Sequence, residues 1–393
     1  MIHCDGSPEA IWELDAALQA MLAGGDAVVP LGSGQVTPPR DPGPGQAVLC
    51  TSGSTGGRKW VQLSASALQA SAEATHLRLA GRGRWLLALP AQHVAGVQVL
   101  VRAALAGNPP AVLDLRGGFD PAGFGIAAHR LAGEAQRCYT ALVPTQLARL
   151  LDTDPAALTG FDAVLLGGAA TPDGLLQRAR AAGVRVVTTY GMTETAGGCV
   201  YDGWPLDGTE IRLEGDSGNI ELSGPMLATG YLDAPEQTAV AFRDGWFRTS
   251  DLGRRDRQGR LQVLGRADDV IITGGLNVAP AEVEAVLTGL PGVAAACVVG
   301  LPDPDWGERV TAVVIPTDAG QPPAGCSPQL RCPKRSSCSM RYRCAGWANR
   351  TAGPFAPCLL HAIADLYPLS PTLSTHSPTP GMDGRANGRF CIT

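Results

Sequence analysis

The sequence predicts an α/β protein: a large N-terminal α/β domain with a β-rich subdomain, then a small α+β C-terminal domain whose end is truncated or aberrant. Between residues 47 and 190, short apolar runs alternate with segments of helical period, which is typical of a βα-repeating domain. Near residue 208, short strand-like runs separated by glycine turns replace this alternation. After residue 265 a short βαββ-like pattern follows. We expect the parts to be residues 1–265 with subdomain 206–265, residues 266–318, and a tail, 319–393.

Runs of strand length predict six strands in the α/β domain, at residues 48–50, 85–89, 111–115, 138–143, 163–166 and 185–189. Segments of helical period predict helices at residues 65–79, 94–106, 124–131, 145–151 and 172–182. Ser64 and Thr171 are the predicted caps of the first and last of these helices, because a hydroxyl can accept a hydrogen bond from the free N–H groups of a helix start.

The rest of the folded chain is predicted to be richer in strands. In the β-rich subdomain we expect strands at residues 218–223 and 260–264. In the C-terminal domain we expect a strand at 270–273, a helix at 280–290, and strands at 293–300 and 309–315.

Composition narrows the class of partner. The chain has 393 residues, of which 45% are hydrophobic, enough for a large core and two or more domains. A net charge of −5 on a mixed-sign sequence gives no basic face for nucleic acid and no polybasic membrane anchor, so we expect small-molecule partners. The first residues are acidic rather than signal-like, and the apolar run 94–106 is short and contains Arg102. We therefore expect a cytoplasmic protein.

One loop carries the strongest chemical signal. It reads Thr-Ser-Gly-Ser-Thr-Gly-Gly-Arg-Lys over residues 51–59, directly after an apolar run. Glycines let the backbone fold closely around an anion, hydroxyls and peptide N–H groups donate hydrogen bonds to it, and Lys59 adds a positive charge. A flexible Ser/Gly linker would need neither the basic pair nor the preceding strand, and the run lacks the Walker A spacing. The loop therefore predicts a phosphate-binding site.

Five further motifs follow in order: Leu-Pro-Ala-Gln-His-Val-Ala-Gly at 89–96, Gly-Gly-Ala at 167–169, Tyr-Gly-Met-Thr-Glu-Thr at 190–195, Thr-Ser-Asp-Leu-Gly at 249–253 and Gly-Arg-Ala-Asp-Asp at 265–269. With the phosphate loop, this order resembles the acyl-adenylating superfamily of acyl-CoA ligases, luciferases and carrier-loading adenylation domains. The resemblance covers about residues 48–316. In open α/β sheets ligands bind beyond the carboxyl ends of strands, and we expect the phosphate loop and the Tyr190 motif there.

The resemblance implies an ATP-dependent ligase that joins a carboxylic acid to CoA through an acyl-adenylate, with Mg²⁺. It implies Lys59, His93, Thr193 and Glu194 as catalytic residues, Glu194 also being the magnesium ligand. The implied nucleotide-binding residues are Thr51, Ser52, Gly53, Ser54, Thr55, Gly56, Gly168, Ala169, Tyr190, Gly191, Met192, Asp251 and Arg266. Asp268 would be the hinge of a mobile C-terminal domain, and Gly274 and Gly275 would bind CoA.

Simpler interpretations stay open for single residues. Glu194 could be an exposed glutamate after a turn, Asp251 and Arg266 could form ordinary loop salt bridges, and His93, expected to border the acyl pocket, could be structural. His76 and His129 are interpreted as surface residues of helices.

The short region before the phosphate loop and the residues of three motifs resemble those of the o-succinylbenzoate:CoA ligases of menaquinone biosynthesis. The implied substrate is 2-succinylbenzoate, and a glycine-lined pocket around Gly197 and Gly198 could also admit other aryl acids. The alternatives are another aryl- or acyl-CoA ligase, a carrier-loading domain, or a nucleotide-binding protein impaired in adenylation. A homodimer is implied by the resemblance.

The tail differs from the rest of the chain. It holds six of the eleven cysteines, four of them at every sixth residue, without the C-x-x-C pairs typical of zinc sites. We interpret it as disordered or frame-shifted, because back-translation in another frame from about Arg335 can spell a Gly-Lys segment like the C-terminal catalytic segment of the superfamily. In the printed sequence Lys334 is the only candidate for that lysine, and its neighbours do not match the motif.

Overall fold

The computed structural model describes residues 1–52, 58–79, 81–134, 137–215, 218–290, 293–316 and 390–391. The chain divides into two units, Met1–Val263 and Leu264–Thr393. The α/β class predicted from the sequence is confirmed.

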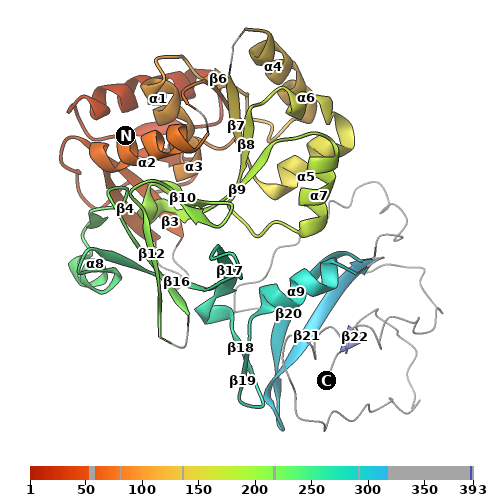
Figure 1. The fold of residues 1–393 in the computed structure, drawn as a ribbon. Coiled ribbons are helices and arrows are strands. Elements are labelled where there is room, and N and C mark those ends of the chain that lie inside the picture. Colours follow the sequence, from red (N-terminus) through yellow and green to blue (C-terminus); the bar gives the residue numbers. More distant parts are fainter. Residues whose placement is uncertain are drawn as a thin grey trace. The chain divides into compact units, whose positions relative to one another are not determined.

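A seven-stranded sheet organises the first unit (Figure 1). Its order is β11 (Trp204–Pro205), β10 (Gly197–Tyr201), β9 (Val186–Met192), β8 (Ala163–Leu166), β7 (Cys138–Leu142), β5 (Arg84–Leu87) and β6 (Ala111–Val112). The strands from β6 to β9 are parallel, whereas β10 and β11 are antiparallel to their neighbours. The five strands predicted between residues 85 and 189 all lie in this sheet.

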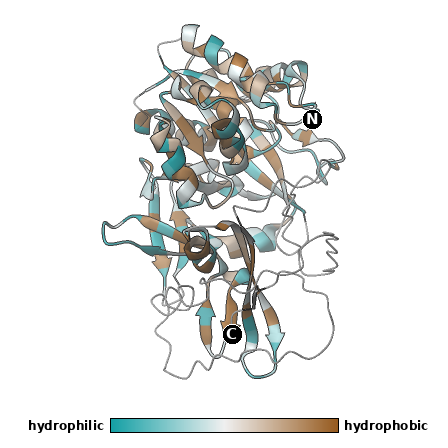
Figure 2. Cartoon of the chain, turned by 90° about the vertical axis from the view of Figure 1, so that its right-hand side faces the viewer, coloured by the Kyte–Doolittle hydropathy of each residue, from teal (hydrophilic) through white to brown (hydrophobic). Residues whose placement is uncertain are grey.

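Helices cover both faces of the sheet, as Figure 1 shows. One face carries α1 (Pro8–Leu22), α2 (Ala65–Arg78) and α3 (Val94–Leu105). The other carries α4 (Pro121–Glu134), α5 (Pro144–Thr153), α6 (Ala156–Thr159) and α7 (Asp173–Ala181). Successive residues of a strand point to opposite faces, so Trp85 and Leu87 join the first core while Leu86 joins the second. The buried strands are therefore mostly apolar, and Figure 2 shows brown arrows between helices of mixed colour.

The helix starts follow from local chemistry in two cases. The Ser64 cap is confirmed, since its side chain accepts a hydrogen bond from the N–H of Ala67. Helix α1, which the sequence analysis did not predict, begins after Ser7, whose side chain accepts from the N–H of Ala10. The Thr171 cap is wrong, because α7 begins at Asp173 and Pro172 occupies the cap position.

The phosphate loop does not lie on the large sheet, which corrects its predicted placement. It joins β3 (Gln46–Ser52) to β4 (Arg58–Ser64) in an antiparallel hairpin. With β14 (Gly230–Tyr231), this hairpin forms a separate three-stranded sheet. An apolar run such as 48–50 suits a parallel or an antiparallel strand equally well, so the sequence could not distinguish the two.

The β-rich part of the first unit contains a five-stranded antiparallel sheet. Its members are β12 (Glu210–Glu214), β13 (Asn219–Ser223), β15 (Phe242–Arg243), β16 (Trp246–Arg255) and β17 (Leu261–Arg266), and α8 (Pro235–Ala241) precedes β15. At the start of the chain, β1 (Ile2–Cys4) and β2 (Pro30–Gly32) form a parallel pair. The predicted strands at 218–223 and 260–264 correspond to β13 and β17.

The second unit is a small α+β structure. After the turn η2 (Ala267–Asp269), its strands are β18 (Ile271–Thr273), β19 (Leu276–Val278), β20 (Val293–Asp303), β21 (Gly307–Pro316) and β22 (Phe390–Cys391). Helix α9 (Pro280–Thr288) contributes Val283 and Leu287 to a core that also contains Ile271 and Val298. The predicted pattern is confirmed with two additions, since β18 turns directly into β19 and β22 pairs with β21.

Two histidines behave differently from each other. His129 is exposed, as predicted, with 61% of its side chain accessible. His76 was predicted to lie on the surface, and this is wrong, because only 2% of it is exposed. Residues 68, 72 and 76 share one side of α2, and that side packs into the core.

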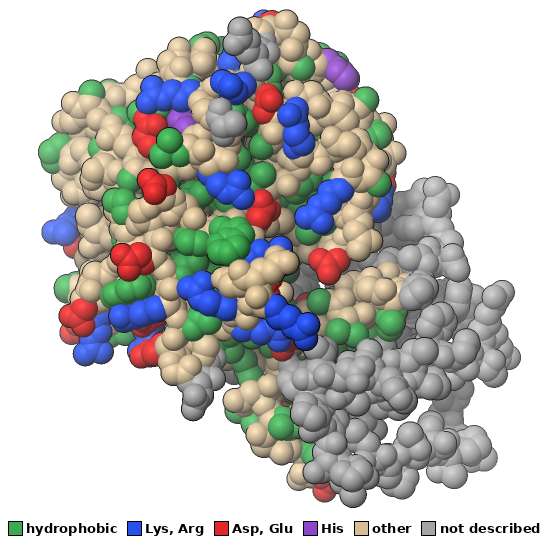
Figure 3. Space-filling model, viewed as in Figure 1, with side chains coloured by type: hydrophobic (Ala, Val, Ile, Leu, Met, Phe, Trp, Pro, Cys, Tyr) green, Lys and Arg blue, Asp and Glu red, His purple; other side chains and the backbone are tan. Residues whose placement is uncertain are grey.

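Among the described residues no helix combines the length and apolar character needed to cross a membrane. On the face drawn in Figure 3, basic and acidic side chains lie interspersed over the described residues.

Candidate active site

The Tyr190 motif forms a tight turn at the carboxyl end of β9. The strand ends at Met192, the 3-10 turn η1 (Thr193–Thr195) follows, and Ala196 takes a left-handed conformation with φ of 49° that leads into β10. The Thr195 hydroxyl accepts a hydrogen bond from the Met192 N–H at 2.9 Å and lies 2.7 Å from the carbonyl oxygen of Gly197, to which it can donate. A side chain at Gly191 would place its Cβ 2.1 Å from the Gly197 oxygen. The turn therefore needs glycine there, and it holds Thr193 and Glu194 at its apex.

Glu194 and Lys59 meet through a third residue, Tyr231. The Tyr231 hydroxyl donates a 2.9 Å hydrogen bond to Glu194 Oε1, and Lys59 Nζ lies 4.9 Å from the centre of the Tyr231 ring. The backbone carbonyl of Glu194 also accepts a 2.8 Å hydrogen bond from the N–H of Ala228. Burial, followed by the neighbouring Glu194 carboxylate, raises the pKa of Tyr231, so its hydroxyl stays protonated and can donate. The three-stranded sheet is thereby joined to the Tyr190 motif.

Asp251 is attached to the same motif. Tyr190 donates a hydrogen bond from its hydroxyl to Asp251 Oδ2 at 2.8 Å. Thr249, which is 4% exposed, accepts a 3.0 Å hydrogen bond from the N–H of Asp251 and donates to the Ile220 carbonyl at 2.8 Å. Burial first, and then the Asp251 carboxylate, raise the pKa of Tyr190, so this hydroxyl also remains a donor. The Asp251 carboxylate is thus fixed beside the end of β9.

Four predicted residues are therefore brought together by described contacts. Lys59 comes from β4, Tyr190 from β9, Glu194 from η1 and Asp251 from β16. The segment 190–194 contacts both the Tyr231 side and the Asp251 side. A basic group and two carboxylates next to one turn suit a phosphorylated nucleotide bound with a divalent cation.

Three other predicted residues lie at the same edge of the large sheet. Leu166 of β8 pairs with Thr188 of β9. Gly168 and Ala169 come shortly after Leu166, as Tyr190 comes shortly after Thr188, so the three residues lie at the same edge. Both small residues are exposed, and Gly168 has a φ of 83° that favours glycine. His93 occupies the cap position of α3, beyond β5, without making a side-chain cap bond. His93 is exposed, yet neighbouring protein atoms partly desolvate the imidazole and lower its pKa.

Only part of the phosphate loop falls within the described residues. Gly53, Ser54, Thr55 and Gly56 lie outside them, as does Gly57. The backbone of Ser52 pairs with Arg58, and that of Thr51 pairs with Lys59. The Thr51 hydroxyl is 3.5 Å from the Lys59 carbonyl oxygen. The hairpin thus fixes the base of the loop and the start of the lysine side chain.

The remaining predicted residues belong to the second unit. Arg266 Nη2 lies 3.8 Å from Asp268 Oδ2, so the predicted nucleotide arginine and the predicted hinge form an ion pair. Gly274 and Gly275 are the two loop residues of the β18–β19 hairpin, with φ of 56° and 83°. A two-residue turn of this kind requires positive φ at both positions, which gives these glycines a structural reason to be present. A Cβ at Gly274 would lie 2.5 Å from the ring of Trp306.

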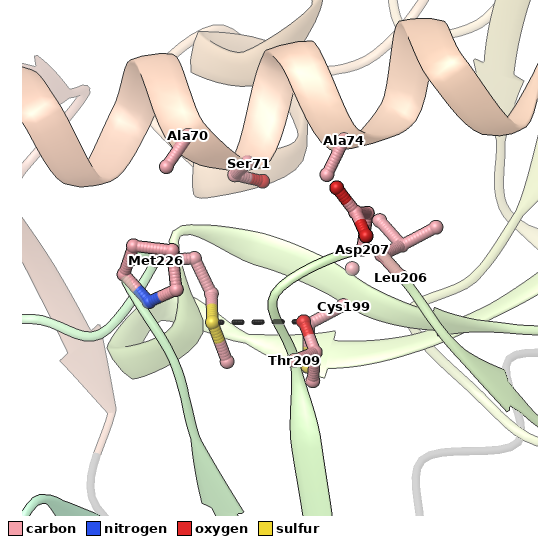
Figure 4. A pocket seen from close by; sticks show the side chains of 10 residues that line it. Ala70, Ser71, Ala74, Cys199, Leu206, Asp207, Thr209 and Met226 are labelled. Carbon is pink, nitrogen blue, oxygen red and sulfur yellow. Dashed lines mark hydrogen bonds between the residues drawn. The ribbon is translucent and has the colours of Figure 1, made fainter.

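The glycines expected to line an acyl pocket also pack tightly. A Cβ at Gly197 would lie 3.2 Å from Gln98, and one at Gly198 would lie 3.1 Å from Thr189 and Tyr201. Gly198 instead borders a small crevice beneath α2, shown in Figure 4. The lining also includes Ser71, Cys199 and Met226, whose sulfur lies 3.7 Å from the Thr209 hydroxyl. Of the residues that line the crevice, Gly198 alone was predicted to border a ligand, the acyl group.

Tyr231 and Thr249 are the residues that sequence reasoning missed. Tyr231 follows Gly230 in an ordinary Gly-Tyr dipeptide, and nothing in the sequence connects it with residues 59 or 194. Thr249 stands in the quoted Thr-Ser-Asp motif, but its buried side chain acts on the backbone rather than on a ligand.

The side chains of the site offer few ligands for a magnesium ion. Within the described residues no group of three or more His, Cys, Asp or Glu side chains could hold a metal ion. Mg²⁺ is commonly bound by one or two carboxylates together with substrate phosphates and water. Glu194 uses Oε1 for Tyr231 and supplies one further oxygen, Oε2. This arrangement suits a cation that arrives with a nucleotide.

The fold and this site together define a nucleotide-binding α/β enzyme. The family model "AMP-binding enzyme" matches residues 6–232, and the model "AMP-binding enzyme C-terminal domain" matches residues 282–362, which extends past the predicted boundary at 318. The chain belongs to the AMP-binding enzyme family.

Two relatives, one of them in two solved structures, illustrate the similarity. A probable 2-succinylbenzoate–CoA ligase of Mycobacterium tuberculosis is 48% identical over 70% of this chain and 72% of that protein. The o-succinylbenzoate CoA synthetase of Bacillus subtilis, solved with the acyl-adenylate intermediate OSB-AMP, is 33% identical with a TM-score of 0.62. That match covers 68% of this chain and 58% of the other. The same Bacillus enzyme solved with ATP and a magnesium ion gives 28% identity and a TM-score of 0.62, over 77% of this chain and 72% of the other.

Proposed function

We propose that this chain is an ATP-dependent acid:CoA ligase that converts 2-succinylbenzoate to 2-succinylbenzoyl-CoA, with release of AMP and pyrophosphate. The observation that carries the proposal is the convergence of Lys59, Glu194 and Asp251 on the segment 190–194. The M. tuberculosis and B. subtilis relatives support the choice of substrate.

In the first step, a carboxylate oxygen of the acid attacks the α-phosphorus of ATP. A new bond forms between this oxygen and the α-phosphorus. The bond between the α-phosphorus and the oxygen that bridges to the β-phosphorus breaks, and its electron pair leaves with pyrophosphate. Both reactants are anionic, so the protein must neutralise and align them. We assign Lys59 and the loop to the β- and γ-phosphates, Thr193 to the α-phosphate, and Asp251 to the ribose hydroxyls. A magnesium ion held by Glu194 would supply further positive charge at the phosphates.

The other nucleotide contacts follow from position. Gly168 and Ala169 leave the backbone beyond β8 open to the base, next to Tyr190. Gly191 and Met192 form the strand end behind it. We assign His93, exposed at the start of α3, to the acid substrate. Its lowered pKa favours the neutral imidazole near neutral pH, which can donate a hydrogen bond to a carboxylate.

In the second step, the thiol sulfur of CoA attacks the acyl carbon. The thiol loses its proton to solvent, and the bond to the AMP oxygen breaks with its electron pair. We assign this step to the second unit, with Gly274 and Gly275 near CoA and Asp268 as the hinge between two arrangements. Arg266 would reach the nucleotide in one of these arrangements.

The tail bears on the first step. The only lysine available for the C-terminal catalytic position is Lys334, which lies outside the described residues. We propose that the reading frame shifts within the tail, from about Arg335, so that this chain is impaired in adenylation. Resequencing the gene tests this directly, since one uninterrupted frame that matches related coding sequences through the tail would disprove the shift.

The function itself is tested by measuring pyrophosphate release across 2-succinylbenzoate, benzoate and other aryl acids, followed by mass spectrometry for the CoA ester. We expect release, even if slow, to be greatest with 2-succinylbenzoate. Preference for another aryl acid would indicate a different acyl-CoA ligase. Nucleotide binding without pyrophosphate release from any acid would identify the adenylation-impaired alternative. A cytoplasmic location and a homodimer remain predictions from the sequence.

A further inference from the structure

Tyr231 lies between two oppositely charged groups of the candidate site. Its hydroxyl donates to Glu194 Oε1 at 2.9 Å, and its ring faces Lys59 Nζ at 4.9 Å from the ring centre. Only 5% of the residue is exposed. Among the described residues, Lys59 and Glu194 form no direct ion pair with each other. One aromatic side chain therefore contacts both charges through different chemical features.

Several contacts hold Tyr231 in this position. Strand β14 pairs with β4, with Tyr231 opposite Val61. The Tyr231 N–H donates to the hydroxyl of Thr238 at 2.9 Å, and the ring of Phe242 lies edge-on at 5.8 Å. A Cβ at Gly230 would lie 2.5 Å from Thr238 Cγ2, so the close approach of β14 and α8 requires glycine there. The side chain is fixed before any ligand binds.

The same segment also fixes the main chain of Glu194. Ala228, three residues before Tyr231, donates its N–H to the Glu194 carbonyl at 2.8 Å. Glu194 is consequently held at its backbone and at one carboxylate oxygen by residues 228–231. This leaves Oε2 of Glu194 to face a ligand.

We propose that Tyr231 is a positioning residue for the magnesium–triphosphate part of the nucleotide site, an inference that rests on the proposed function. It aims the Glu194 carboxylate and keeps the Lys59 ammonium on its aromatic face. A direct ion pair between Lys59 and Glu194 would partly neutralise both groups. A cation over an aromatic ring keeps its charge and can turn toward phosphate oxygens, while a carboxylate with one hydrogen bond retains its charge for a metal ion.

The proposal predicts a selective effect on ligands. AMP has no β- or γ-phosphate and needs neither Glu194 nor Lys59, whereas MgATP needs both. Tyr231→Phe keeps the ring and removes only the hydrogen bond to Glu194. We expect it to weaken MgATP binding about tenfold, in line with the loss of one hydrogen bond to a charged group. AMP binding should change less than about twofold. The lost hydrogen bond acts on Glu194, which AMP does not need.

The experiment is calorimetric titration of the full chain with AMP and with MgATP, supported by the Mg²⁺ concentration that half-activates pyrophosphate release. Tyr139→Phe is the matched control, because it also removes a buried tyrosine hydroxyl, which donates to the Leu79 carbonyl at 2.7 Å, outside the site. Its thermal stability should fall while its MgATP-to-AMP affinity ratio stays unchanged. Thr238→Val, which loosens the backbone of Tyr231, should lower the ratio by a smaller factor and decides the matter if Tyr231→Phe does not fold.

An unchanged MgATP-to-AMP ratio in Tyr231→Phe, or equal losses for both ligands, would overturn the positioning role. Failure of the proposed function looks different. In that case the unaltered chain releases no pyrophosphate with any acid, while the two titrations still report on Tyr231.

Discussion

The Tyr190 hydroxyl donates a 2.8 Å hydrogen bond to Asp251 Oδ2 and so joins two motifs that lie 61 residues apart in the sequence. The bond fixes the carboxylate of Asp251 beside an aromatic ring at the end of β9. A base stacked near that ring would place its ribose within reach of the carboxylate. The contact brings the two motifs together in one part of the candidate site.

The first prediction concerns this carboxylate. Asp251→Asn should weaken AMP and MgATP binding equally, by about tenfold or more, because a carboxylate accepts hydrogen bonds from two ribose hydroxyls and an amide accepts fewer. Calorimetric titration with the two ligands measures it, and Asp114→Asn, at an exposed ion pair, is a suitable control. Nucleotide affinities that match the unaltered chain would remove Asp251 from the site.

The second prediction concerns the turn at the end of β9. Gly191→Ala should destabilise the first unit by about 2–4 kcal/mol, because its Cβ would lie 2.1 Å from the Gly197 oxygen and the backbone must shift. Gly133→Ala, near the exposed end of α4 with nothing within 4 Å, should instead be neutral or stabilising by up to about 1 kcal/mol. Urea unfolding of both variants checks the contrast. Similar free energies of unfolding for the two would contradict the tight turn.

The third prediction concerns His76 and pH. Burial, and next the Arg102 charge, lower its pKa from 6.5 to about 4, despite opposing contributions from Glu73. The unfolded chain therefore binds a proton below pH 6.5 that the folded chain refuses until about pH 4, so stability falls as the pH drops through this window. The expected loss is up to about 3 kcal/mol at 1.4 kcal/mol per pKa unit.

Urea unfolding between pH 4 and pH 8 measures this contribution. His76→Gln should show a shallower fall in unfolding free energy than the unaltered chain, whereas His129→Gln, at an exposed position, should not. Identical pH profiles for all three proteins would show that His76 titrates normally.

The fourth prediction separates the two half-reactions. If the tail lacks the adenylation lysine, formation of the acyl-adenylate should be slower by about 10²–10³, as expected for loss of one preorganised transition-state donor. Transfer of the acyl group from supplied acyl-adenylate to CoA should continue at a rate typical of the family. Rapid-quench assays of each half-reaction, with a frame-corrected gene as control, test this. Equal losses in both half-reactions would contradict the selectivity.

The sequence predicted the parallel sheet well for a physical reason. Strands buried on both faces must be apolar throughout, and such short runs stand out between helices, as at residues 163–166, which are β8. Residues 48–50 carry the same signal but pair antiparallel, because pairing direction depends on partners far away in the chain. His76 was predicted to lie on the surface, although its spacing from residues 68 and 72 indicated the buried side of α2.

The residues of the candidate site also differ in how far the sequence could predict that they meet. The proximity of Lys59, Glu194 and Asp251 could be predicted because each belongs to a motif whose order along the chain is distinctive. Tyr231 could not, since its importance comes from the approach of β14 to η1, a contact between parts of the chain that are distant in sequence. Long-range packing of this kind leaves no local pattern.

The measurement that tests the central claim most directly is calorimetric titration of the unaltered chain, Glu194→Gln and Asp251→Asn with AMP and with MgATP. We predict one competitive site for both ligands, with Asp251→Asn weakening both and Glu194→Gln weakening MgATP alone. If the folded, unaltered chain takes up neither nucleotide, or both variants bind as it does, then Lys59, Glu194 and Asp251 do not form a nucleotide pocket.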